Sequence, residues 1–212
     1  MKDEHFIHLH NPFGKGKRVL FIGGPMTYCQ KLGDTFPGGF GLGASCKRND
    51  YVHRVMRFAK KVNKDPAFLL ISSKIWEENY KDTKDIMQFY KDCINFNPDT
   101  VILQLCDYMS TDDFDYKIFK NSLKELIKFI DPSENSQVVL ITAYETRATA
   151  DSVQKIANEL NLPCLYLGNL MSAKCYDPSS YNDAPAKYYP NDQAMKKIAQ
   201  AVMCIIENSL RK

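Results

Sequence analysis

Side chains that could carry out catalysis are few in this sequence of 212 residues, and they are unevenly placed. Three of the four histidines stand at positions 5, 8 and 10, and no histidine follows His53. His53 falls within a helical pattern, which favours a partly buried structural role. A serine or cysteine nucleophile needs a neighbouring base. The remaining, nonstandard candidates for catalysis are Cys29 and Asp192, and Asp192 is also well placed to cap a final helix.

Metal and nucleotide sites are not indicated. His8 and His10 would share one face of a strand, a spacing that can hold a metal ion. Chance histidines in an N-terminal arm are the favoured interpretation. The sequence contains no G-x-x-x-x-G-K-[ST] motif, and the turn at residues 23–28 (GGPMTY) does not match G-x-G-x-x-G. We therefore expect no metal and no cofactor.

The charge balance excludes several classes of protein. Lys and Arg number 28 and Asp and Glu 25, which gives a net charge of +3, and 44% of the residues are hydrophobic. These values are typical of a soluble globular domain and argue against a disordered chain or a strongly basic nucleic-acid binder. One helical pattern carries a basic face, interpreted as solvated surface: Arg48, Arg54, Arg57, Lys60, Lys61 and Lys64. We expect no nucleic-acid partner.

The compartment signals favour a cytoplasmic protein. No segment reaches the roughly 18 apolar residues that a membrane span needs, so no membrane association is expected. The N-terminus has no basic region leading into an apolar run. The seven cysteines are odd in number and scattered in spacing, which argues against a disulfide framework. The sequence leaves homo-oligomerisation open.

Short apolar runs alternate with helical patterns along the chain. Five runs rich in Val, Ile and Leu predict buried parallel strands at residues 18–23, 67–72, 100–105, 137–142 and 164–168. Amphipathic patterns predict helices at residues 50–64, 82–95, 115–130, 146–160 and 192–210. This alternation predicts a three-layer α/β/α sandwich around a parallel sheet, of the flavodoxin-like type. We expect one domain over residues 1–212, with 1–16 as an N-terminal arm in which 6–13 form an edge strand or a lead-in.

Two long irregular stretches follow predicted strands. Nine of the ten glycines lie at or before position 43, so residues 24–49 form a glycine-rich loop. Residues 169–191 hold three prolines and four tyrosines. Long loops in a compact domain are usually functional, and ligands bind an open parallel sheet at the carboxyl ends of its strands. A binding site is therefore expected where these two loops emerge.

Three segments, in order, resemble the SGNH (GDSL-type) esterase and acylhydrolase family. Residues 19–27 (VLFIGGPMT) resemble the family's strand followed by G-D-S-[IL]-T, and residues 40–45 (FGLGAS) resemble its glycine-bearing second block. Residues 188–192 (YYPND), which lead into the last helical pattern, resemble its D-x-x-H-P block, and 101–108 stand where the family has G-x-N-D. The resemblance spans nearly the whole chain and implies the SGNH fold and ester hydrolysis by a Ser–His–Asp triad.

The resemblance also implies that the catalytic residues are replaced. Pro25 stands at the serine position, where it supplies neither a hydroxyl nor a backbone N–H. Tyr108 takes the position of the oxyanion-binding Asn, Tyr189 that of the His, and Ala186 that of the Asp. Gly41 or Gly43 keeps the place of the glycine oxyanion donor. Loss of a triad nucleophile or base costs several orders of magnitude in rate, so ordinary SGNH hydrolysis is not expected.

The replacements predict a cleft that binds and does not hydrolyse. Tyrosine offers a flat apolar face with a polar tip, which suits sugars and other rings. The predicted cleft comprises Gly24, Pro25, Tyr28, Gly41, Gly43, Tyr108 and Tyr189. The first hypothesis is a pseudoenzyme that binds a glycan, a small acyl ligand or a protein partner there; simple filling of the vacated pocket by tyrosines is the alternative use of these side chains. Two further hypotheses are an esterase with nonstandard residues and an interaction module that docks through the acidic loop 111–115.

Overall fold

The core of the structure is one six-stranded sheet in the order β1-β3-β2-β4-β5-β6. The computed structural model describes residues 5–33, 36–109, 112, 114–142, 147–169 and 189–211. Five strands run parallel: β2 (Arg18–Gly23), β3 (Ala67–Ser72), β4 (Thr100–Gln104), β5 (Gln137–Ile141) and β6 (Cys164–Leu165). These are the five predicted strands, and two of them have the predicted bounds. The α/β prediction is thereby confirmed.

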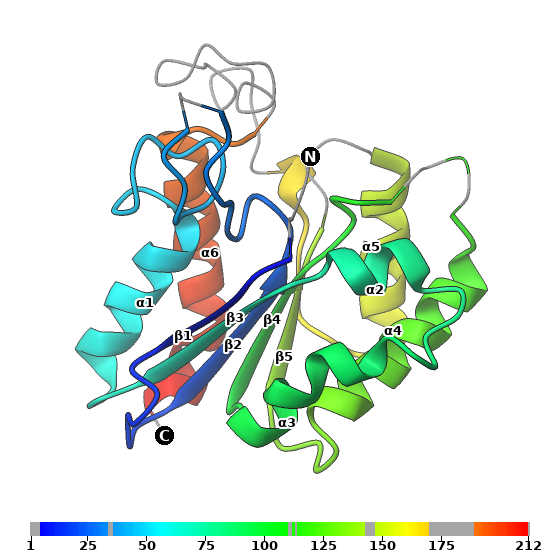
Figure 1. Cartoon of the computed structure of the whole chain (residues 1–212), viewed down its shortest axis with the longest axis horizontal. Helices are drawn as coiled ribbons and strands as arrows, with labels where there is room; N and C mark the ends of the chain where they lie inside the picture. Colours follow the sequence, from blue (N-terminus) through cyan, green and yellow to red (C-terminus); the bar gives the residue numbers. More distant parts are fainter. Residues whose placement is uncertain are drawn as a thin grey trace.

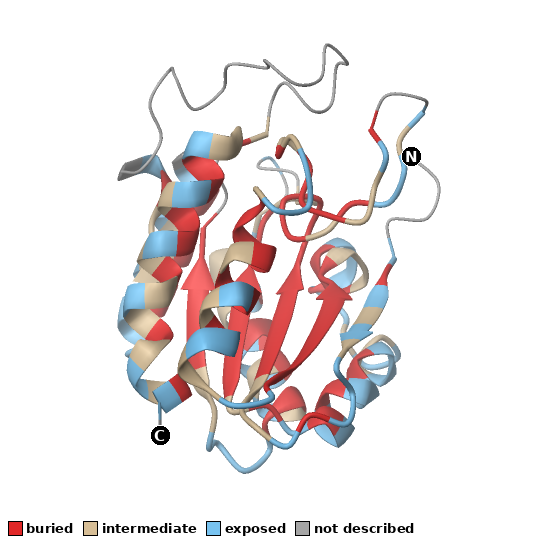
Figure 2. Cartoon of the chain, turned by 90° about the vertical axis from the view of Figure 1, so that its left-hand side faces the viewer, coloured by how far each residue is buried: buried red, intermediate tan, exposed pale blue. Residues whose placement is uncertain are grey.

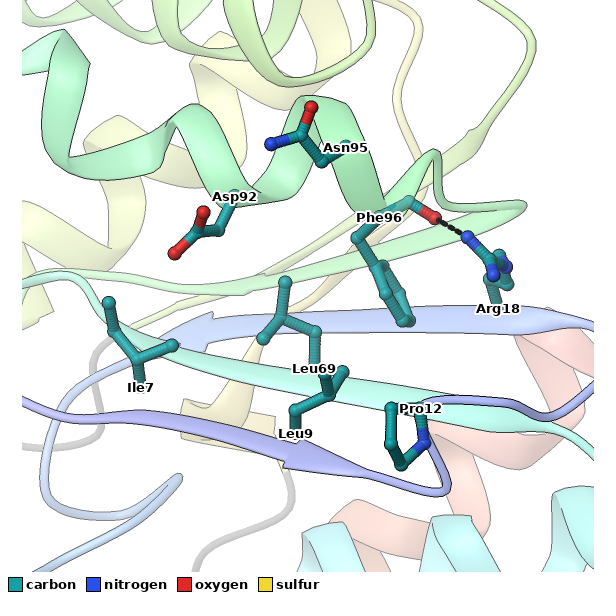
Figure 3. Close-up of a pocket in the computed structure, with 8 residues that line it drawn as sticks. All are labelled: Ile7, Leu9, Pro12, Arg18, Leu69, Asp92, Asn95 and Phe96. Atoms are coloured by element: carbon teal, nitrogen blue, oxygen red, sulfur yellow. Dashed lines mark hydrogen bonds between the residues drawn. The ribbon is translucent and has the colours of Figure 1, made fainter.

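The sixth strand, β1 (Ile7–His10), lies at the edge of the sheet and pairs antiparallel with β3. Of the two alternatives that the sequence left for residues 6–13, an edge strand or a lead-in, the structure therefore shows an edge strand. Its side chains alternate: His8 and His10 face the same side as Leu70 and Phe68, and Ile7 and Leu9 face the other. Ile7 and Leu9 are about half exposed and line a cavity of about 380 Å³ with the Phe96 ring (Figure 3).

Helices cover both faces of the sheet (Figure 1). One face packs against α1 (Tyr51–Val62) and α6 (Asp192–Arg211), which lie side by side. The other face packs against four helices: α2 (Lys74–Asn79), α3 (Lys91–Phe96), α4 (Tyr116–Ile130) and α5 (Arg147–Glu159). The strands between the two layers are almost entirely buried (Figure 2).

Successive residues of a strand point alternately into two separate hydrophobic cores. In β2, Val19 and Phe21 point into the α1–α6 core, whereas Leu20 and Ile22 point into the core below α2 to α5. Because both faces of each strand are buried, the strands read as continuous apolar runs in the sequence. This is why the apolar runs in the sequence predicted the parallel strands well.

One helix prediction is wrong. Residues 82–95 do not form a single helix but a turn, a 3₁₀ helix (Met87–Tyr90) and then α3. The buried Tyr90 hydroxyl donates to the Ser72 carbonyl at 3.0 Å and accepts from the Trp76 N–H at 3.3 Å. This attachment to β3 and to α2 holds the 3₁₀ segment in place. Helix α2 itself was not predicted, because six residues carry too little periodicity to reveal it.

None of the cysteines that the structure describes forms a disulfide. Cys93 and Cys106 are buried, Cys164 is half-buried, and Cys204 is exposed on α6. Among the helices that the structure describes, none is both long and apolar enough to cross a bilayer.

Candidate functional site

The turn after β2 carries the position where the resemblance implies a nucleophile. Pro25 is buried there, and its carbonyl accepts the Leu42 N–H at 2.8 Å. The hydroxyl of Thr27, two residues on, is fully buried and lies 2.6 Å from the Tyr51 hydroxyl and 3.3 Å from Gln104 Oε1. Burial raises the pKa of Tyr51 well above its ordinary value, so this phenol stays neutral. The turn therefore presents a proline and a threonine that is already bonded on two sides.

A buried carboxylate ties the glycine-rich loop to the start of α1. Asp50, at the N-cap of α1, accepts the Gly41 N–H at 3.0 Å through Oδ2. It also accepts the His53 N–H at 2.6 Å and contacts His53 Nδ1 at 2.6 Å. Of the two glycines considered for the oxyanion, Gly41 thus has its amide occupied. Gly43, with φ of +95°, lies against Tyr189 and Pro190, so a Cβ there would come within 2.6 Å of the Pro190 carbonyl oxygen.

Asp192 ties the same loop to the start of α6. Its carboxylate accepts the Ser45 N–H at 2.7 Å and the Ser45 hydroxyl at 2.5 Å, and the Asn49 amide at 2.8 Å. The helix cap comes from Asn191, whose Oδ1 accepts the N–H groups of Gln193 and Ala194, each at 3.1 Å. The expectation that Asp192 caps the last helix is therefore wrong, because that carboxylate bridges two segments far apart in sequence.

The turn after β4 is held by Glu77 of α2. Glu77 Oε2 accepts the Tyr108 N–H at 2.8 Å, and burial raises the pKa of this carboxyl to about 7, against the opposing effect of that N–H. Cys106, two residues before Tyr108, has φ of +76°. Its thiol is fully buried, and burial raises its pKa well above the ordinary value. Cys106 is therefore not a thiolate nucleophile at neutral pH.

The two turns meet directly. Gln104 at the end of β4 accepts the Gly24 N–H at 3.1 Å and donates to Asp107 Oδ1 at 3.0 Å. A Cβ at Gly24 would collide with the Asp107 carboxylate. The Tyr108 ring lies beside Lys74 of α2, whose Nζ is 5.4 Å from the ring centroid. The predicted cleft residues Gly24, Pro25 and Tyr108 thus come from neighbouring strand ends.

Tyr28 lies on the β1 side of this region. Its ring packs 4.1 Å from that of His8 and 4.9 Å from that of Phe6, measured between centroids. Cys29 is buried and forms a backbone bridge with Phe40. Tyr189 is half-buried beside Gly43, whereas Ala186 lies outside the described residues.

His8 and His10 lie on β1, and His53 of α1 lies close to His10. The His53 ring lies 6.1 Å from that of His10, and burial, then the nearby His53, lower the pKa of His10 to about 4. Within the described ranges no cluster of three or more His, Cys, Asp or Glu side chains is arranged to hold a metal ion.

Four residues that organise the site were not singled out from the sequence: Asp50, Tyr51, Glu77 and Gln104. Asp50 had a usable signal, because an Asp directly before an amphipathic helix is a typical N-cap. Gln104 and Tyr51 carry no signal, since their role depends on which strand and helix lie next to β2. Glu77 belongs to the short helix that periodicity did not reveal.

Several proteins of known structure share this fold at low sequence identity. No model of a protein family matches the chain, and no curated protein gives a significant match. Solved structures do match. A GDSL-family lipolytic protein from Desulfitobacterium hafniense DCB-2 superposes with a TM-score of 0.57 at 14% identity, over 90% of this chain and 99% of that one.

Two carbohydrate esterases match equally well. An acetylxylan esterase from Geobacillus stearothermophilus, studied as a catalytic mutant, has a TM-score of 0.59 at 17% identity, over 90% of this chain and 94% of that chain. A family two carbohydrate esterase from Cellvibrio japonicus has a TM-score of 0.56 at 12% identity, over 93% of this chain and 62% of that chain. The chain therefore has the three-layer α/β/α fold of the GDSL-type lipolytic proteins and carbohydrate esterases, as the sequence predicted.

Proposed function

We propose that this protein is a non-hydrolytic relative of the SGNH esterases that binds an acylated carbohydrate at the carboxyl ends of β2 and β4. The observation that carries the proposal is Pro25. It follows β2 at the position where the resemblance implies the attacking serine, and its carbonyl accepts the Leu42 N–H. A proline there removes the nucleophile and one oxyanion donor together.

The neighbouring hydroxyl and thiol groups that could replace a serine are poorly suited to act as a nucleophile. The Thr27 hydroxyl is buried between Tyr51 and Gln104, and the Cys106 thiol has a raised pKa. The Ser45 hydroxyl bonds to a carboxylate and to the Asn49 amide. A carboxylate is a much weaker base than an imidazole at neutral pH, so this pair is poorly suited to activate a hydroxyl.

The ligand class follows from two considerations. Neighbours of the same fold include esterases described as acting on acetylxylan and on acetylated mannans. Tyr108 and Tyr189 are half-buried at the turns after β4 and before α6, where the resemblance implies Asn and His. Aromatic faces in these places favour contact with a sugar ring over chemistry on its acyl group.

Hydrolysis assays test the enzymatic half of the proposal. We expect p-nitrophenyl acetate to be cleaved no faster with the purified protein, or with a surface variant such as Lys128→Gln, than in buffer alone. The alternative, an esterase with nonstandard residues, is favoured by the activity of its structural neighbours. It predicts turnover that is lost in Cys29→Ala, Ser45→Ala or Asp192→Asn. Turnover with this mutational pattern would overturn the pseudoenzyme proposal.

Calorimetric titration with acetylated xylo-oligosaccharides tests the binding half. Binding should weaken about tenfold in Tyr189→Ala, since an aromatic contact contributes about 1–2 kcal/mol. The matched control is Tyr116→Ala on α4, which removes a tyrosine whose hydroxyl donates to Glu159 at the end of α5, and it should leave the affinity unchanged. Absence of saturable binding by the wild-type protein, or equal losses in the two variants, would contradict the proposed ligand site.

A further inference from the structure

A groove runs between the outer sides of α1 and α6. It has a volume of about 230 Å³ and is lined by Arg54, Arg57, Phe58, Lys61, Lys196, Gln200 and Met203. The two helices are neighbours on the same face of the sheet, and their outward sides are shown in Figure 2. The α1–α6 groove, as we call it, lies on the solvent side of these helices and is separate from the strand ends.

The walls of the α1–α6 groove carry four positive charges. Arg54, Arg57 and Lys61 come from α1, which contains no Asp or Glu, and Lys196 comes from the second turn of α6. The two arginines donate hydrogen bonds to uncharged groups. Arg54 donates to the backbone carbonyl and the side-chain amide oxygen of Asn49, and Arg57 donates to the Arg48 carbonyl. Among the ion pairs between described residues, none involves these four cations.

The cations repel one another. Partial burial and then the charges of Arg54 and Arg48 lower the pKa of the Arg57 guanidinium. With a net charge of only +3 for the whole chain, this concentration of positive charge is local. Like charges held together in a concave site raise the local potential and attract an anion.

We propose that the α1–α6 groove binds a compact polyanion that carries two or more phosphate groups. Guanidinium groups pair with phosphate oxygens through two parallel N–H bonds, and lysines supply point charges around them. Gln200 adds an amide donor at the side, and Phe58 and Met203 are half-buried apolar contacts for the carbon skeleton of such a ligand.

Size and shape favour a small molecule over a macromolecule. A nucleic acid needs a basic track along several phosphates. On α6 the basic stretch ends where Glu207 pairs with Arg211 at 2.6 Å. A membrane surface would call for protruding apolar side chains, whereas Phe58 and Met203 are half-buried within the groove.

The test is calorimetric titration of the full chain with inorganic tripolyphosphate at about 25 mM NaCl, where screening is weak. The key variant is the triple change Arg57→Gln, Lys61→Gln and Lys196→Gln, which leaves Arg54 and its bonds to Asn49 intact. The matched control removes the same charge from α4 through Lys117→Gln, Lys124→Gln and Lys128→Gln, all at exposed positions.

We expect saturable binding to the wild-type protein and to the α4 control, and at least a tenfold loss in the groove variant. Tripolyphosphate should also raise the melting temperature of the wild-type protein and not that of the groove variant, which separates lost binding from lost folding. No saturable binding, or equal losses in the two triple variants, would overturn the proposal.

Two further titrations assess other anionic partners. Phosphatidylserine vesicles and a 12-nucleotide single strand present phosphates on a membrane and on a polymer. Binding of either one without binding of tripolyphosphate would overturn the proposal of a small-molecule site. Because the α1–α6 groove excludes the strand ends, this result is independent of the acylated-carbohydrate titration.

Discussion

Asp50 and Glu77 are two buried carboxylic acids that hold neighbouring loops in different ways. Asp50 begins α1 and accepts hydrogen bonds from Gly41 and from the backbone of His53, and it also contacts the His53 ring. Glu77 lies within α2 and holds the turn after β4 through the Tyr108 N–H. Asp50 is fully buried and Glu77 only 2% exposed.

The difference lies in what surrounds each carboxyl group. Asp50 accepts a backbone N–H on each of its oxygens, and its Oδ2 also contacts His53 Nδ1. For Glu77, desolvation outweighs the donors, and its pKa is raised to about 7. The two loops, which meet at the same edge of the sheet, should therefore respond differently to the loss of their carboxyl group, and substitutions in each loop test this contrast.

The largest effect is expected for Asp50→Ala. This change leaves the Gly41 and His53 donors without their acceptor in a buried place, which costs about 3–5 kcal/mol in free energy of unfolding. Urea denaturation measures the loss. The control is Asp115→Ala, an exposed N-cap of α4 that should cost about 1 kcal/mol. Equal losses would show that Asp50 is no more than a helix cap.

Gly43→Ala should cost about 3 kcal/mol, because a Cβ would press on Tyr189 and Pro190 in a left-handed conformation. Gly39→Ala is the matched control. Gly39 has φ of +86° but no atom within 4 Å of the place where an alanine methyl group would lie, so only the conformational cost of about 1–2 kcal/mol applies. A similar loss in both variants, measured by thermal denaturation, would refute close packing of the glycine-rich loop against the start of α6.

Glu77→Gln should change the pH dependence of stability. In the wild-type protein the raised pKa favours the protonated carboxyl, so its stabilising contribution is complete below about pH 4.5 and is lost as pH rises through about 7. The loss between pH 5 and 8 is on the order of 2 kcal/mol. Urea midpoints at the two pH values should converge in Glu77→Gln.

The exposed neighbour provides the control for this pH experiment. Glu78→Gln removes a carboxyl that pairs with Lys74 at the surface, 3.7 Å away, and should keep the wild-type dependence on pH. If Glu77→Gln also keeps it, the carboxyl of Glu77 is ionised throughout the range, and the contrast with Asp50 fails.

The smallest effect is expected at the start of α6. Asn191→Ala removes the acceptor for Gln193 and Ala194 at the start of α6 and should cost about 1 kcal/mol. Asp192→Asn keeps an oxygen for Ser45 but weakens a charge-assisted bond, so chemical denaturation should show a loss without any change in helix capping. A greater helical loss in Asp192→Asn than in Asn191→Ala, measured by circular dichroism, would reverse the assignment of the cap.

The strands were predictable because they are buried on both faces, and the long helices because one stripe of each faces a core. In the candidate site, the sequence offered a prediction only where a residue type is itself informative, as with Pro25 and the glycines, and the role of these residues stays a prediction. Contacts between segments that are separated in the sequence, such as Thr27 with Tyr51 or Asp192 with Ser45, depend on which segments become neighbours in the fold. No local pattern encodes that choice, so these contacts had to come from the structure.

The placement of β1 has a consequence for how the chain acquires its shape. Ile7 pairs with Ile71, so the first strand cannot dock until a template made by a distant segment exists. The entropic cost of closing this stretch resembles that of pairing β2 with β4, but β1 has β3 as its one neighbour in the sheet. The five parallel strands can therefore pair with one another without β1, which adds to the edge of the sheet only where β3 is already in place.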